Sequence, residues 1–343
     1  MSGRPHWQRW WSIGGALTGL VALVWVFWRV EYDRVLEVID QANAAFVLMV
    51  PLAIALEQLV RAWKWRQLLF AIQPVGTLRL FGAIMAGYFA NLLVPLGISP
   101  FVRSWLVARL EALKMSAVLA TAAIDRLVDG LIFTGFVAVA VTSAAFPDPD
   151  GDIRLGLIVG GVGSFALFTL LWVALVRYKR RVGLPGAWIT RIADRLPVRF
   201  AEPVKRIMRS FAEGVVWPRE AWRGAGIVFA SIVIKLIAIT HFLWASLAFG
   251  LVLNALDYLF LVVFLGFLII LSRLARIPGG FLVGAIFALD LLGVPDEQAL
   301  VMVLLVQVSS LLAVASIGAF ALWRSGIALD ELRLAKGNAV ERS

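Results

Sequence analysis

Arginines recur inside segments that are otherwise apolar, and their chemistry suggests phosphate binding. Arg103, Arg126, Arg273 and Arg276 all lie within or beside such segments. A guanidinium group grips a phosphate through two parallel hydrogen bonds, so these four side chains predict a clamp for a phosphate head group. A charge inside a bilayer costs about 2.5–3.5 kcal/mol on translocon scales, which favours a functional reason for keeping it.

Carboxylates accompany these arginines. Asp125 and Asp129 are four residues apart, so a helix places them on one face, with Arg126 about 100° away from Asp125. Asp290 lies late in a short apolar segment, and Lys235 lies within a long one. We expect the three acids to release or replace a bound phosphate, and Asp129, Asp290 and Lys235 to serve in gating or proton coupling.

A simpler interpretation is that the acids neutralise the arginines and hold helices together. It is the expected one for Glu57 and Arg61, which are four residues apart and form a pair by helical spacing.

Two backbone breaks lie beside the arginines, PLG at 95–97 and PGG at 278–280. A break frees N–H and C=O groups that lipid cannot satisfy, so protein, water or a polar ligand must supply partners. Paired broken helices in two halves of a chain predict a transporter site near the midplane, although Gly and Pro also simply kink membrane helices. The binding residues expected at the breaks are Asn91, Pro95, Gly97, Pro278, Gly279 and Gly280.

The elements that must carry these residues are apolar helices. Of 343 residues, 61% are hydrophobic and 16% are charged, which predicts an all-α polytopic membrane protein of one domain, 1–343. We expect about eight spans and a broken, re-entrant hairpin, with the two breaks in pseudo-symmetric elements. The expected segments are 12–28, 43–60, 78–94 with 101–112 as the hairpin, 116–145, 155–176, 225–249, 258–276, 281–293 and 298–323.

Charge in the loops predicts orientation. Segment 177–223 holds twelve Lys or Arg against four Asp or Glu, so we expect a basic cytoplasmic loop and both termini in the cytoplasm. Arg61, Lys64 and Arg66 alternate with tryptophans, which is typical of a membrane interface.

Several functions are disfavoured by composition. The chain has no cysteine and only two histidines, so we expect no disulfide and no metal site. It has no GxxxxGK[ST] motif, and we predict no cofactor and no catalytic residue. The net charge of +10 fits cytoplasmic loops that contact anionic lipid better than it fits nucleic acid.

Six stretches follow one another in a familiar order: RAWKWRQLL, NLLVPLG, FVRSWLVARL, AIDRLVDGL, ARIPGGF and LDLLGVPDEQAL. The ordered set resembles the lysylphosphatidylglycerol synthase transmembrane-domain family, also called flippase-like, over about residues 45–323. The resemblance implies a bacterial inner-membrane protein that moves or holds a lipid or lipid-linked head group. Some relatives carry an aminoacyl-transferase domain, which we do not expect here after residue 323.

The chain departs from the family where glutamates are common. Pro100 stands three residues before Arg103 at one such position, and Gly284 and Ala285 follow the second break at another. Aspartate also replaces the usual glutamate in the 125–129 helix. The loss of two acids makes the site more cationic, so we expect an anionic or isoprenoid- or hopanoid-type lipid rather than a cationic one.

The resulting hypothesis is a lipid transporter in which Arg103 and Arg276 bind a phosphate while Arg126 and Asp129 orient or gate it. One alternative is a scaffold that recruits a lipid-biosynthesis enzyme through 177–223. Another is a lipid-modifying enzyme that uses Asp125 and Asp129. The expected partners are the lipid, anionic lipids at the basic loop, and a second copy or a biosynthetic enzyme.

Overall fold

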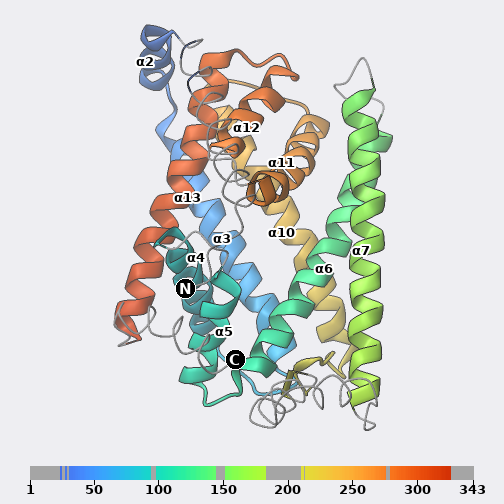
Figure 1. Ribbon diagram of the computed structural model, residues 1–343. Coiled ribbons are helices and arrows are strands. Elements are labelled where there is room, and N and C mark those ends of the chain that lie inside the picture. Colours follow the sequence, from blue (N-terminus) through green and yellow to red (C-terminus); the bar gives the residue numbers. More distant parts are fainter. Residues whose placement is uncertain are drawn as a thin grey trace, which may run out of the picture. The chain divides into compact units, whose positions relative to one another are not determined.

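The computed structural model describes residues 24, 28, 31–93, 98–143, 151–182, 210–211, 213–275 and 279–325 (Figure 1). For 178–182 and 272–275 it describes the main chain only. The described part contains ten α-helices and no strand, which confirms the all-α prediction. It opens with the short helix α2 (Tyr32–Asp40), which has no buried residue.

Four of the described helices are long and apolar enough to cross a membrane, as a polytopic membrane protein requires. They correspond to four of the expected spans, and they are α3 (Ala44–Leu69), α7 (Asp152–Val182), α10 (Ala221–Ala248) and α13 (Asp296–Arg324). The expected segment 12–28 lies outside the described residues apart from two positions. The full number of spans stays a prediction.

Two helices carry charged residues along their length. Helix α3 continues to Leu69 instead of ending near residue 60, so its last turns carry Arg61 and Lys64. Helix α6 (Met115–Thr142) is as long as a span, but it holds Asp125, Arg126 and Asp129 near its middle. Both helices therefore bring ionisable groups into apolar surroundings.

Each backbone break separates two shorter helices that pack against each other as a hairpin. The first hairpin is α4 (Thr77–Leu93) with α5 (Ser99–Leu110), and the second is α11 (Ala255–Ala275) with α12 (Gly280–Asp290). Gly279 precedes α12 with a φ of +71°, a left-handed conformation that glycine adopts without strain. The break residues Pro95, Gly97, Arg276 and Pro278 lie outside the described residues.

The chain divides into two compact units whose boundaries fall inside α3, α6, α7, α10 and α13. Unit 1 comprises residues 1–54, 133–163 and 235–310, and unit 2 comprises 55–132, 164–234 and 311–343. Hairpin α4–α5 belongs to unit 2, whereas hairpin α11–α12 belongs to unit 1. The expectation that the two breaks form one site stays a prediction.

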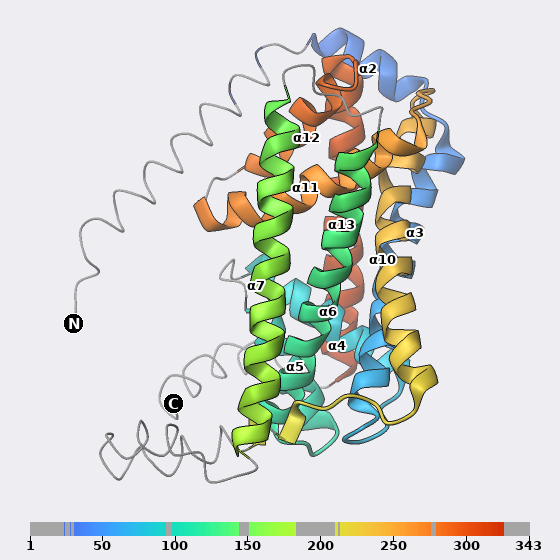
Figure 2. The ribbon, with the colours of Figure 1, turned by 90° about the vertical axis from the view of Figure 1, so that its right-hand side faces the viewer.

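Unit 1 packs aromatic rings against small residues. Helix α11 runs crosswise to the parts of α7 and α10 in this unit (Figures 1 and 2). The rings of Phe133 and Phe267 meet edge to face at 5.4 Å between centroids. A Cβ on Gly266 would lie 2.6 Å from the Phe133 ring, so glycine is what allows α11 to approach α6 this closely.

Unit 2 has an apolar core to which α3, α4, α5, α6 and α10 all contribute. Its members include the fully buried Trp65 and Leu80, together with Leu106, Val118 and Ile227. This core surrounds the inward faces of α3 and α6, and so it forms the low-dielectric setting in which the charges of those two helices must find partners.

The α4–α5 hairpin depends on Gly87, where a Cβ would lie 2.9 Å from the carbonyl oxygen of Ser99. Because the obstacle is backbone, we expect Gly87→Ala to lower the free energy of unfolding by about 1–3 kcal/mol. Gly135 is the matched control, since a Cβ there meets nothing within 4 Å. Gly135→Ala should leave the thermal midpoint of the detergent-purified protein unchanged or slightly higher, through better helix propensity. Equal midpoints for the two variants would contradict a tight hairpin.

Candidate functional site

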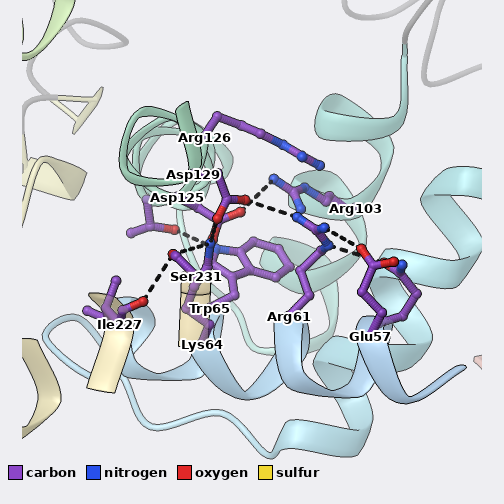
Figure 3. Close-up of polar contacts among 12 residues, drawn as sticks. Glu57, Arg61, Lys64, Trp65, Arg103, Asp125, Arg126, Asp129, Ile227 and Ser231 are labelled. Carbon is purple, nitrogen blue, oxygen red and sulfur yellow. Dashed lines mark hydrogen bonds and ion pairs between the residues drawn. The ribbon is translucent and has the colours of Figure 1, made fainter. Parts of the chain in front are cut away.

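Seven ionisable side chains of unit 2 gather between α3, α5 and α6 (Figure 3). We call this group the charge cluster, and its members are Glu57, Arg61, Lys64, Arg103, Asp125, Arg126 and Asp129. Helical spacing explains how α3 and α6 supply them. Residues 57, 61 and 64 recur at intervals of four and three along α3, and 125 and 129 are four apart along α6, so each set shares one face.

Lys64 is at the centre of the cluster and is completely buried. Its Nζ lies 2.7 Å from Oδ1 of Asp125 and donates a hydrogen bond of 2.5 Å to Oδ1 of Asp129. A third contact reaches Oγ of Ser231 on α10 at 3.3 Å. An isolated ammonium group would be very costly here, and two carboxylates compensate for its burial.

Arg61 joins the same network one turn earlier on α3. Its guanidinium donates hydrogen bonds to Oδ2 of Asp129 at 3.0 Å, to Oε1 of Glu57 at 2.7 Å and to Oε1 of Gln58 at 3.2 Å. The predicted pair of Glu57 with Arg61 is therefore confirmed. Arg61 and Lys64 are buried in unit 2, where the carboxylates of α6 neutralise both cations inside the protein. That this stretch marks a membrane interface stays a prediction.

Arg103 is buried with far fewer partners. Its side chain is fully enclosed, yet Nε, Nη1 and Nη2 donate no hydrogen bond to any residue that the structure describes. Oδ2 of Asp125 lies 3.7 Å from Nη2, which is an ion pair beyond hydrogen-bonding distance. The guanidinium carbon lies 4.8 Å from the ring centroid of Trp65, a cation–π contact.

The ring of Trp65 is itself held in place. Its indole N–H donates a hydrogen bond of 3.0 Å to Oγ1 of Thr121, whose hydroxyl donates to the carbonyl oxygen of Val118 at 2.7 Å. This chain fixes the aromatic face on which Arg103 rests. The position of the guanidinium is thus set by packing and by Trp65, and no described residue accepts a hydrogen bond from it.

Arg126 lies beside Arg103, and its side chain is exposed on the surface of unit 2. Its Nη2 lies 3.4 Å from the hydroxyl oxygen of Tyr88 on α4. The two guanidinium groups repel each other electrostatically, and Figure 3 shows them on the same side of the cluster. Two neighbouring cations, one buried and one exposed, form a site that is suited to an anionic group.

The other residues predicted from the sequence fall elsewhere. Asn91 lies in the last turn of α4, and its buried Oδ1 accepts no hydrogen bond from a described residue. Lys235 lies in unit 1 with Nζ 5.1 Å from the centroid of the Phe133 ring, and Asp290 is exposed at the end of α12 in the same unit. Gly279 and Gly280 also belong to unit 1. The remaining predicted positions, Pro95, Gly97, Arg276, Pro278 and the side chain of Arg273, lie outside the described residues.

The structure therefore brings together four of the predicted residues, which are Arg103, Asp125, Arg126 and Asp129. Sequence reasoning missed the roles of Lys64, Trp65, Tyr88 and Ser231. The spacing of Glu57, Arg61 and Lys64 was a usable signal, because it matches the face that Asp125 and Asp129 form on α6. Among the residues that the structure describes, no group of three or more His, Cys, Asp or Glu side chains could hold a metal ion.

The family model for the lysylphosphatidylglycerol synthase TM region matches residues 11–318, a range that includes the whole charge cluster. No curated protein matches the chain, and no solved structure matches it.

Removing Lys64 should destabilise the protein strongly. Lys64→Met leaves Asp125 buried without its closest cation, so we expect a loss of about 3–5 kcal/mol in the free energy of unfolding. Lys64→Met combined with Asp125→Asn should recover part of that loss, because both charges of the pair are then gone. Thermal unfolding of the purified variants is the measurement.

Lys114 provides the control for this prediction. It pairs with Glu213 at 2.9 Å in the same unit, but the side chain is 67% exposed. Lys114→Met should therefore change stability by less than about 1 kcal/mol. If Lys64→Met shifts the unfolding midpoint no more than Lys114→Met does, the cluster is not what joins α3 to α6.

Proposed function

The chain belongs to the lysylphosphatidylglycerol synthase TM family, and from this premise we propose that it is a flippase-like lipid transporter. It binds a lipid or lipid-linked head group and translocates it across the bacterial cytoplasmic membrane. The substrate is anionic or of the isoprenoid or hopanoid type, and a phosphate group is the part that the protein holds. The observation that carries the proposal is the buried guanidinium of Arg103, which has no hydrogen-bond acceptor among the described residues.

A buried arginine of this kind supports an anionic ligand on energetic grounds. Removing a cation from water costs several kcal/mol unless hydrogen bonds and an opposite charge compensate for it. Asp125 supplies an ion pair at 3.7 Å but no hydrogen bond. A phosphate offers two oxygens in the geometry that guanidinium matches, so it would satisfy the donors that the protein leaves open.

The surroundings of Arg103 favour a lipid as the carrier of that phosphate. Large apolar side chains are exposed on the same hairpin, Leu92 and Leu93 at the end of α4 and Phe101 at the start of α5. These residues flank the break that precedes Arg103 in the chain. A head group on Arg103 with its hydrocarbon chain along these residues uses both features, whereas a soluble anion uses only the first.

The carboxylates of the cluster act as counter-charges in this proposal, and we assign no catalytic step to them. Asp125 and Asp129 are held by Lys64 and Arg61. In facilitated scrambling, the lipid gradient alone drives transport. In proton-coupled transport, Asp129, Asp290 and Lys235 are the residues that carry the coupling. We further propose that both termini are cytoplasmic, that 177–223 contacts anionic lipids, and that a second copy or a lipid-biosynthesis enzyme is the protein partner.

Arg103→Gln tests the function directly, since it removes the charge and keeps most of the side-chain volume. Wild type should retain one class of anionic lipid through purification and should move a fluorescent analogue of that class across the bilayer of proteoliposomes. We expect Arg103→Gln to lower both by about tenfold or more, as loss of a charged hydrogen-bonded contact implies. Mass spectrometry of retained lipids and a dithionite-quenching assay are the readouts.

Arg79→Gln is the matched control, because Arg79 lies on the same hairpin but is 69% exposed and pairs with Glu111. It should behave as wild type in both assays. Equal, bulk-like lipid in wild type and Arg103→Gln, with unchanged thermal midpoints, would overturn the assignment of Arg103 to a ligand and would favour the scaffold function instead.

A further inference from the structure

Asp125 is shared between two cations that have very different surroundings. Its carboxylate is fully buried, with Oδ1 2.7 Å from Nζ of Lys64 and Oδ2 3.7 Å from Nη2 of Arg103. Lys64 is itself shared with Asp129. The negative charge of Asp125 therefore belongs mainly to Lys64, and Arg103 receives only part of it.

The charges of the cluster can be counted by their contacts. Arg61 and Lys64 hold Glu57, Asp125 and Asp129 in one connected network, so two cations face three carboxylates. Arg103 and Arg126 add two further cations outside that network. The whole cluster, with four cations and three carboxylates, carries one net positive charge.

Other ionisable pairs in the described part of unit 2 leave this count unchanged. Arg79 pairs with Glu111, Lys114 with Glu213, and Arg223 with Glu220, so each adds no net charge. Arg103 is buried, and a net charge near it is poorly screened by solvent. The ligand that neutralises the site best therefore carries one negative charge.

From this balance we infer that Asp125 is a specificity-determining residue, which makes the site prefer a lipid phosphate of one net negative charge over a dianion. The inference rests on the proposed function, since it concerns the ligand of the same site. With Asp125 ionised, a phosphodiester that lacks other charges neutralises the cluster. A phosphomonoester dianion leaves one negative charge in excess, and a zwitterionic head group leaves the positive charge uncompensated.

Competition between two lipids on the full chain tests this inference. The probes are phosphatidylmethanol, a phosphodiester of one negative charge, and phosphatidic acid at about pH 8.5, where its phosphate approaches two. Both have the same acyl chains and are presented in equal amounts to the detergent-purified protein. Native mass spectrometry gives the ratio of bound lipids, with zwitterionic phosphatidylcholine as the reference and excess inorganic phosphate as the competitor that distinguishes a lipid site from a free-phosphate site.

Wild type should favour phosphatidylmethanol by about fivefold or more, and phosphate should not displace it. Asp125→Asn raises the charge of the cluster by one, so the ratio should shift about tenfold toward phosphatidic acid, the size expected for a charge-assisted contact. Asp125→Asn with Arg126→Gln returns the charge to its original value and should restore the wild-type preference. Glu213→Gln changes an exposed acid of the same unit and should leave the ratio unchanged.

Further variants distinguish an effect on folding from an effect on lipid preference. Asp125→Glu keeps the charge and should keep the preference. If Asp125→Asn does not fold, Arg126→Gln alone serves, because this exposed residue lowers the cluster charge to zero and should shift binding toward phosphatidylcholine. A wild type that binds no anionic lipid overturns the proposed function. The other outcome is that wild type binds anionic lipid, but neither Asp125→Asn nor Arg126→Gln alters the ratio of bound lipids. That result overturns this inference and leaves the proposed function intact.

Discussion

The contact of Lys64 with Asp125 and Asp129 is the interaction on which the rest of unit 2 depends. It ties α3 to α6 through a fully buried ammonium group, and the bond to Ser231 extends it to α10. Such a group tolerates burial only while both carboxylates remain in place. Helices α3 and α6 are therefore held in one register, because a shift of either helix by one turn would leave the buried charges without partners. An apolar interface alone would not fix the register so tightly.

That register also positions the arginine we assign to the ligand. Trp65 follows Lys64 directly in α3, and its ring is locked by Thr121 of α6. The ring in turn carries Arg103 of α5, whose helix approaches α4 closely at Gly87. The α4–α5 hairpin thus packs, through Arg103, against the Trp65 ring, whose position depends on the Lys64 contacts. A buried ion pair often adds little net stability to a protein. The contacts of Lys64 nevertheless have a structural purpose here, because they specify where Arg103 must lie.

Much of the fold was predictable from the sequence, because an apolar run long enough to span a membrane satisfies its backbone hydrogen bonds best as a helix. The face shared by Asp125 and Asp129, and the pair of Glu57 with Arg61, followed from helical spacing alone. The burial of Lys64 did not, because tryptophans beside cations are typical of a membrane interface and the compensating carboxylates lie about sixty residues away. Local spacing predicts which side chains share a face, but it does not predict which faces meet. The division of the two hairpins between separate units was unpredictable for the same reason.

The cluster separates charges that hold the fold from the charges that we assign to a ligand. Arg61 and Lys64 pair with the three carboxylates, and Lys64, Asp125 and Asp129 are buried together. Arg103 is buried and Arg126 is exposed, and both have few hydrogen bonds of their own. Had Asp125 lain within hydrogen-bonding distance of Arg103, that arginine would have joined the structural network and would have had fewer donors for the anion that we propose. In our proposal, the difference between 2.7 Å to Lys64 and 3.7 Å to Arg103 leaves the donors of Arg103 to the ligand.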